Sequence, residues 1–154
     1  MNKINTLNTL IKTINNKNIL NSNIPNLYNL KNTINKYNGN DWIKYNKYSN
    51  NYDKQLVYRN KLYELFVITW MPFSESKIHD HSYNGCLYSI LDGILIEELY
   101  DKHIKLNNVS FLKKRDCGYI NNEMYYHKMI NNTNKITTSL HLYSPPSYKM
   151  NIFD

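Results

Sequence analysis

The chain has 154 residues, of which 42% are apolar and 20% charged, enough for one ordinary domain and too few for two. It contains no apolar run of the roughly 20 residues that cross a bilayer, and its first residues lack the apolar stretch and cleavage site of a secretory signal. Its two cysteines are too few for a disulfide scaffold. We therefore expect a protein of the reducing cytoplasm with no membrane partner.

The net charge of +7 comes from the N-terminal third. Residues 1–54 carry eight lysines against two aspartates, a balance of +6, whereas residues 55–154 have a balance of +1. Sixteen asparagines also fall within the first fifty residues. A basic arm could bind nucleic acid, but the sequence has no basic stripe interleaved with aromatic residues. The pattern therefore favours biased composition, and we expect no nucleic-acid partner.

The first forty residues predict two short amphipathic helices. Apolar residues recur at spacings of three and four from Ile4 to Ile14 and again from Leu27 to Tyr37. Asparagine is a mediocre helix former, so these helices need a surface on which to dock. Residues 41–54 are predicted to form a connection. We expect residues 1–54 to be a helical segment that packs on the remainder within one structural domain.

From residue 55 onward the pattern changes to short runs rich in branched and aromatic residues, bounded by Gly, Pro, Asn or Asp. Their spacing is typical of an antiparallel β sandwich or barrel. The pair Asp92-Gly93, between two of these runs, predicts a tight turn. The sequence thus predicts a mainly β domain at residues 55–154.

The first chemical motif is His79-Asp80-His81. On a strand, residues two apart point to the same face, so the two imidazoles would lie side by side as metal ligands do. A His-x-His pair alone is weak evidence, because two surface or partly buried histidines give the same pattern. A third histidine on a later strand would complete a site with positions open to other ligands.

The spacing that follows this pair resembles the first motif of the cupin superfamily. Four residues separate His81 from Cys86 and six more separate Cys86 from Gly93, with cysteine in place of the usual glutamate ligand. His127 begins a partial match to the second cupin motif. The resemblance implies a cupin-like antiparallel jelly-roll barrel, whose strands bring distant residues together. Three neutral imidazoles suit Fe, Zn, Cu or Ni.

Residues 57–154 resemble thiol dioxygenases of the cysteine dioxygenase type I family, and Ser-Leu-His-Leu-Tyr-Ser-Pro-Pro at 139–146 is the most specific part of the match. The resemblance implies one Fe(II) ion held by His79, His81 and His127. It also implies a reaction that adds both atoms of O2 to the sulfur of L-cysteine to give cysteine sulfinate. Members of the family generally continue for further strands, so we expect a barrel shortened at its C-terminus, with a more open pocket.

The same resemblance implies two substrate-binding residues. Arg59 matches an arginine that pairs with the substrate carboxylate, a role suited to a planar guanidinium group. Without the resemblance, Arg59 would be interpreted as a surface residue of an edge strand. Val57 aligns with a tyrosine that helps to bind substrate in some members, so the neighbouring Tyr58 would have to supply that hydroxyl.

Three further residues are implied to be catalytic. Cys86 and Tyr143 match a pair that forms a thioether in many members, and His141 matches a histidine that orients the tyrosine. Ser139, His141 and Tyr143 alternate along one strand and are predicted to face inward together. The alternatives are a small buried cysteine, a core tyrosine and an ordinary polar strand face.

Two other functions stay open. The protein could oxidise another small thiol, 3-mercaptopropionate or cysteamine, although Arg59 favours cysteine. Alternatively, a non-catalytic cupin could bind a metal or metabolite without turnover. We expect a monomer in either case.

Overall fold

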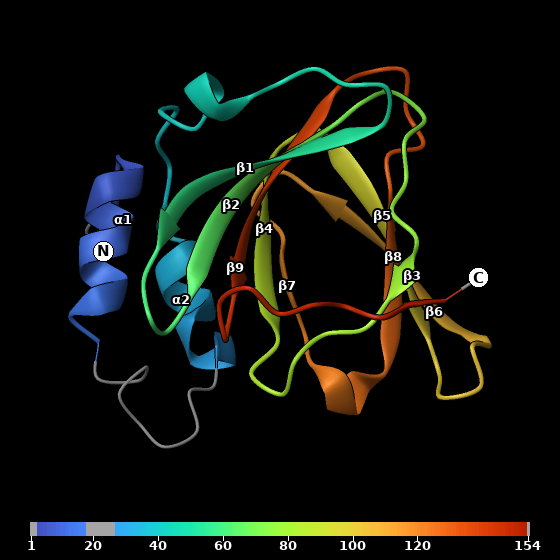
Figure 1. Cartoon of the computed structure of the whole chain (residues 1–154). Coiled ribbons are helices and arrows are strands. Elements are labelled where there is room, and N and C mark those ends of the chain that lie inside the picture. Colours follow the sequence, from blue (N-terminus) through green and yellow to red (C-terminus); the bar gives the residue numbers. More distant parts are fainter. Residues whose placement is uncertain (1–2, 18–26, 154) are drawn as a thin grey trace.

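The computed structural model describes residues 3–17 and 27–153, and its core is a pair of five-stranded antiparallel sheets that face each other (Figure 1). The first sheet has the strand order β1-β2-β9-β4-β7 and the second has the order β10-β3-β8-β5-β6. The strands of the first sheet are β1 Tyr52–Arg59, β2 Glu64–Trp70, β4 Cys86–Asp92, β7 Cys117–Ile120 and β9 Thr137–Tyr143. Those of the second are β3 Ile78–His79, β5 Ile94–Tyr100, β6 Leu106–Lys113, β8 Tyr126–Ile130 and β10 Ile152–Phe153. The predicted mainly β architecture is confirmed.

The two helices that the apolar spacing predicts are present on the outer face of the first sheet (Figure 1). The first, α1 Leu7–Asn15, is capped by Thr6, whose hydroxyl accepts a hydrogen bond from the Thr9 amide. The second helix consists of η2 Leu27–Leu30 and α2 Lys31–Ile34. Two short 3-10 turns, η3 Ile43–Tyr45 and η4 Asn122–Met124, complete the helical elements of the described residues. No helix in these described ranges is long and apolar enough to span a membrane.

The central strands of the first sheet are buried on both faces because the sheet separates two cores. Its outward-facing leucines and valine pack against the apolar stripes of the helices, which supply the docking surface that asparagine-rich helices need. Its inward-facing residues pack against the second sheet. Every residue of β2 and β9 is consequently buried. Strand alternation thus gives β9 one face for the helices and another for the barrel interior.

Two details differ from the sequence-based expectations. Strand β1 begins at Tyr52, inside the segment predicted to be a connection, because its largely half-exposed residues show no apolar run. The Asp92-Gly93 turn is present, and Gly93 has a φ of 84°, in the left-handed region that glycine tolerates. The strands that it joins, however, lie in different sheets and do not pair with each other. The turn therefore carries the chain from one sheet to the other.

Candidate metal centre and its cavity

Three buried histidines converge between the two sheets. His79 at the end of β3 pairs directly with His127 of β8, and their Nε2 atoms are 3.2 Å apart. The Nε2 atoms of His81 and His127 are 2.9 Å apart. His81 was expected on the same strand as His79, but β3 ends at His79 and His81 lies in the segment that follows. The three ligand nitrogens nevertheless lie within 4.8 Å of one another.

The rings of His79 and His127 each form a hydrogen bond through Nδ1, and these bonds orient the Nε2 atoms toward the place where the three histidines converge. The Nδ1 atom of His79 lies 2.8 Å from the carbonyl oxygen of Lys77, which can only accept a hydrogen bond. The Nδ1 atom of His127 lies 2.8 Å from the carboxylate of Glu97, which is itself buried. In neutral imidazoles these bonds place the proton on Nδ1 and leave Nε2 as a lone pair. Two lone pairs then face the same small volume.

The electrostatics of the cluster favour a cation. Burial, followed by the charge of His127, lowers the pKa of His79 to about 3. The same causes, in the same order, hold the pKa of His81 well below its usual value. Uncharged imidazoles with converging lone pairs repel one another unless a metal ion lies between them, and nitrogen donors of this kind suit first-row transition metals. The residues therefore fit a bound metal.

Glu97 is a residue of the site that the sequence analysis missed. It lies in β5 and orients His127 through the hydrogen bond described above, as carboxylates commonly do for metal-bound histidines. The sequence did contain an indication of this position. Residues two apart on a strand point to the same face, so Glu97 points to the same face as Leu95 and Leu99, both of which pack in the interior core.

A second buried chain of polar groups lies beside the histidines. The indole Nε1 of Trp70 donates to the Ser139 hydroxyl at 2.8 Å, and that hydroxyl is 2.8 Å from Nε2 of His141. The serine oxygen accepts from Trp70 and can donate its own proton to Nε2 of His141, an arrangement in which the His141 proton is on Nδ1. That nitrogen lies 3.4 Å from the Tyr143 hydroxyl and 3.6 Å from the Cys86 sulfur. The predicted inward row of β9 is thus present.

Cys86 and Tyr143 are directly opposite each other on neighbouring strands β4 and β9. Burial raises the pKa of the Cys86 thiol, and burial together with the adjacent Cys86 holds the pKa of Tyr143 well above its usual value. Both groups therefore keep their protons at neutral pH. The ring of Tyr143 stacks on those of His81 and His141, which joins this pair to the three-histidine cluster.

The structure does not bring the two expected substrate-binding residues to this site. Arg59 lies at the end of β1, its side chain is 48% exposed, and its guanidinium group forms an ion pair at 2.8 Å with Glu64. The hydroxyl of Tyr58 accepts hydrogen bonds from Asn15 and Asn60, and its ring packs in the core beneath the helices. A bulge in β1 lies between residues 56 and 58, and Tyr58 packs toward the helices and does not line the cavity beside the histidines.

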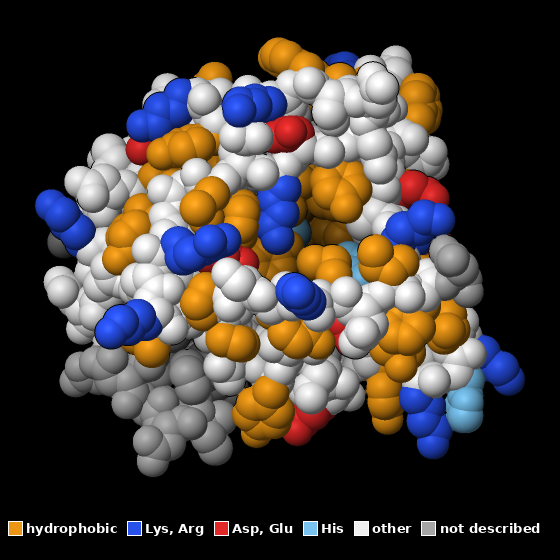
Figure 2. All heavy atoms as spheres, viewed as in Figure 1, with side chains coloured by type: hydrophobic (Ala, Val, Ile, Leu, Met, Phe, Trp, Pro, Cys, Tyr) orange, Lys and Arg blue, Asp and Glu red, His pale blue; other side chains and the backbone are white. Residues whose placement is uncertain are grey.

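A cavity of about 80 Å³ lies next to the cluster and is bounded by His79, His127, His141 and Tyr143. It is much smaller than the roughly 300–1,000 Å³ of pockets for drug-sized ligands, so it suits a small molecule. Figure 2 shows a hollow in this face, with histidine atoms inside it and hydrophobic and basic side chains around it. One lining residue, Lys54 of β1, was also missed by the sequence analysis.

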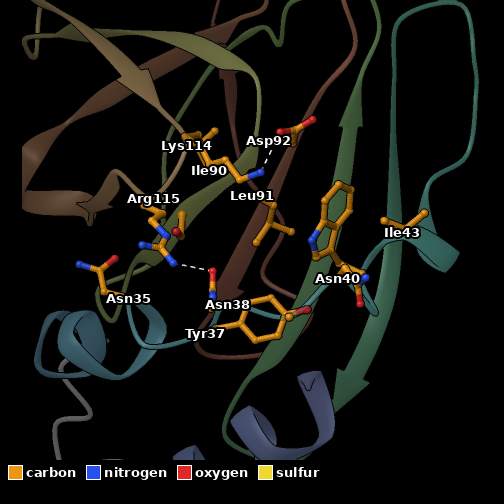
Figure 3. Close-up of a pocket in the computed structure, with 13 residues that line it drawn as sticks. Asn35, Tyr37, Asn38, Asn40, Ile43, Ile90, Leu91, Asp92, Lys114 and Arg115 are labelled. Atoms are coloured by element: carbon orange, nitrogen blue, oxygen red, sulfur yellow. Dashed lines mark hydrogen bonds and ion pairs between the residues drawn. The ribbon is translucent and has the colours of Figure 1, made fainter. Parts of the chain in front are cut away.

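A larger cavity of about 370 Å³ lies elsewhere, where the segment 35–43 meets β4 and the turn after β6 (Figure 3). No histidine or cysteine lines it. Its two basic side chains already have partners, since Lys114 pairs with Asp92 and Arg115 donates to Asn38. The larger cavity therefore lacks the metal ligands of the smaller one.

Two antiparallel sheets that enclose three converging imidazoles define a metal-binding protein of the cupin class. Solved structures agree with this fold. A protein with a double-stranded β-helix domain from Klebsiella pneumoniae superposes with a TM-score of 0.57 at 16% identity, covering 71% of this chain and 86% of its own. A cupin superfamily protein from Desulfitobacterium hafniense gives a TM-score of 0.51 at 11% identity, covering 64% of this chain and 82% of its own. The predicted cupin-like barrel is confirmed.

Within that class, the chain belongs to the cysteine dioxygenase type I family, whose model matches residues 2–154. Cysteine dioxygenase type 1 of Danio rerio is 33% identical over 127 residues, which cover 76% of this chain and 63% of that relative. This chain thus spans somewhat less than two thirds of the relative that it matches. The predicted family is confirmed.

Proposed function

We propose that this protein is an Fe(II)-dependent thiol dioxygenase that oxidises L-cysteine with O2 to cysteine sulfinate. Its family membership supports the proposal. The observation that carries it is the set of three buried imidazoles whose Nε2 atoms converge beside a small cavity. In this proposal His79, His81 and His127 hold the iron.

Iron, when bound, supplies a Lewis acid that lowers the pKa of a coordinating thiol and a redox centre for the reaction with O2. The protein supplies three ligands and so leaves coordination positions for small molecules. A small ligand that fills this cavity displaces water from it, which strengthens the electrostatic interactions between the ligand and the lining side chains.

Tyr143 is the proposed catalytic hydrogen-bond donor. In the tautomer with its proton on Nδ1, His141 donates toward the tyrosine oxygen, and the tyrosine O–H, which lies beside the Cys86 sulfur, can turn to donate to the sulfur or oxygen of a bound ligand. The raised pKa of Tyr143 keeps that proton in place at neutral pH. His141 acts by positioning the hydroxyl, and Ser139 and Trp70 hold His141 in turn.

We also propose that Cys86 forms a thioether with a ring carbon of Tyr143. Their direct pairing on β4 and β9 supports this, because opposed residues of an antiparallel pair have Cβ atoms about 4.5–5.5 Å apart. Forming the S–C bond breaks the thiol S–H bond and one ring C–H bond, and O2 takes up the two hydrogens and two electrons to give H2O2. An intact mass lowered by two hydrogens after incubation with iron, cysteine and O2, and unchanged for Cys86→Ser, is the expected result.

The activity is tested by O2 uptake of the iron-reconstituted protein with L-cysteine, with the sulfinate quantified by mass spectrometry. Cysteamine and 3-mercaptopropionate are run in parallel. Stoichiometric conversion of cysteine supports the proposal, whereas preferential oxidation of another thiol would reassign the substrate. No oxidation of any thiol by protein that retains iron would favour a non-catalytic cupin.

Two narrower expectations accompany the proposal. A monomer is proposed, and light scattering coupled to size-exclusion chromatography tests it. A reducing, cytoplasmic setting is proposed because both cysteines are free thiols and the thiol substrate must stay reduced. Localisation of the tagged full-length protein tests the second.

A further inference from the structure

We propose that Lys54, rather than Arg59, binds the carboxylate of a small thiol in the cavity beside the three histidines. This inference rests on the proposed function and deepens it, because it names the group that distinguishes carboxylate-bearing thiols from a thiol that carries only an amine. Lys54 matches no residue that the sequence analysis singled out. The argument depends on where two cations of the same strand lie and on what each one contacts.

Lys54 is inside the cavity, held in an aromatic corner. Its Nζ lies 4.0 Å from the ring centre of Tyr143 and 4.1 Å from that of Phe66, and the two rings meet edge to face. Cation–π contacts of this kind position an ammonium group without neutralising it. The ring of Tyr143 also stacks on His81, with centres 5.9 Å apart. The ammonium group and one of the three histidines thus contact the same tyrosine ring, and Lys54 lines the same cavity as His79 and His127.

Arg59 is not available to bind a ligand carboxylate in the same way, because its guanidinium group is already paired with the carboxylate of Glu64. The Nε and Nη2 atoms of Arg59 both lie 2.8 Å from one carboxylate oxygen of Glu64, whose side chain is only 7% exposed. Glu64 faces Arg59 directly across the β1–β2 hairpin, so the ion pair is built into the strand register. Removing Arg59 from it would leave a buried carboxylate without its partner.

Glu64 forms its ion pair with Arg59 and acts on Lys54 only at longer range. No residue in the ranges 3–17 and 27–153 forms an ion pair with Lys54. Burial lowers the pKa of Lys54, and the nearby Glu64 carboxylate opposes this effect without reversing it. A ligand carboxylate at this position supplies the missing charge. Lys77 also borders the cavity, but its side chain is exposed at the rim.

Anaerobic titration calorimetry on the iron-loaded protein tests this inference without turnover. The ligands are L-cysteine and 3-mercaptopropionate, which carry a carboxylate, and cysteamine, which does not. The variants are Lys54→Met, which keeps the length of the side chain, and Lys54→Arg, which keeps its charge. Arg59→Gln is the competing variant, and Lys77→Met is the matched lysine control. Iron content and the thermal midpoint are measured for each, and Lys54→Gln replaces Lys54→Met if that variant does not fold.

For Lys54→Met we expect the Kd of both carboxylate thiols to rise by about 30-fold or more relative to the Kd of cysteamine, the loss typical of truncating one partner of a buried charge pair. Lys54→Arg should recover most of the affinity, and Lys77→Met should leave the ratio near that of the wild type. The inference is overturned if Lys54→Met weakens all three thiols equally, or if Arg59→Gln changes the ratio as much or more.

Failure of this inference is distinct from failure of the proposed function. Oxidation of cysteine by a wild type whose carboxylate selectivity does not depend on Lys54 would refute the role of Lys54 alone. Binding that depends on Lys54, in a protein that oxidises no thiol, would refute only the oxidation. If the iron-loaded wild type binds none of the three thiols, both proposals are wrong.

Discussion

Glu97 orients one histidine of the candidate metal centre, because its buried carboxylate accepts a hydrogen bond from Nδ1 of His127. The bond fixes the tautomer and the plane of the ring, and a neighbouring carboxylate also makes the imidazole a stronger donor. His79 has only a carbonyl oxygen in the corresponding place. Of these two ligands, His127 is therefore the one whose donor strength depends on a removable side chain.

We predict that Glu97→Ala weakens iron binding by about 10–100-fold, the usual cost of losing such a partner. Glu97→Gln should lie between this variant and the wild type, because its amide oxygen still accepts the proton. Competition with a calibrated chelator measures the affinity. Glu98→Ala is the matched control, since Glu98 is the acceptor of Tyr100 instead. Equal losses from the two alanine variants would contradict the role of Glu97.

The hydroxyl of Tyr143 is predicted to act in turnover more than in binding. For Tyr143→Phe we expect kcat for cysteine to fall by about 10–100-fold, the effect of losing a hydrogen bond to a charged group, with a smaller change in KM. Steady-state O2 uptake measures both constants. Tyr119→Phe, whose hydroxyl bonds the backbone of Asn84, should behave as the wild type. An unchanged kcat for Tyr143→Phe would remove the catalytic role.

The two faces of strand β9 have different roles: one packs in the apolar core, and the other carries polar side chains of the candidate site. Leu140 and Leu142 belong to the core beneath the helices, whereas His141 and Tyr143 face the barrel interior. Both leucines are fully buried. Since side chains alternate along a strand, a change on one face need not move groups on the other.

Leu140→Ala should therefore cost about 2–5 kcal/mol of the free energy of unfolding, the range for truncating a buried leucine. Urea denaturation measures the loss. The folded variant should still bind iron in the wild-type ratio and turn over cysteine at the wild-type rate. Loss of iron from protein that remains folded would show that the two faces are coupled.

The N-terminal helices and the barrel share one apolar core, so the molecule should behave as a single cooperative unit. Leu10 and Ile14 of α1 are in the same cluster as Leu65 of β2 and Leu142 of β9. The helices are short and rich in asparagine, and most of their stability must come from this contact.

Unfolding is accordingly predicted to be two-state. Far-ultraviolet circular dichroism, which follows the whole backbone, and tryptophan fluorescence, to which the buried Trp70 contributes, should give the same midpoint. Leu10→Ala should lower both midpoints together. Separate transitions, or a fluorescence midpoint that Leu10→Ala leaves unchanged, would mean that the helices and barrel unfold independently.

Much of the candidate site could be predicted from the sequence, because it depends on the spacing of residues that are close together in the chain. His79 and His81 are close in sequence, and the alternation of Ser139, His141 and Tyr143 along one strand follows from the period of two. The helix faces followed from spacings of three and four. These features depend on neighbouring residues, whose relative directions the backbone sets.

The positions of three charged side chains could not be predicted locally, because they depend on how the sheets assemble. These residues are Lys54, Arg59 and Glu97. The bulge and hairpin register of β1 and β2 place Arg59 opposite Glu64 and leave Lys54 in the cavity. The pairing of β5 with β8 brings Glu97 to His127. Register and sheet order arise from packing between segments far apart in the chain, and a one-residue shift reverses the face of every side chain. Local sequence thus predicted the three histidines that converge in the structure, while tertiary packing selected which charged groups surround them.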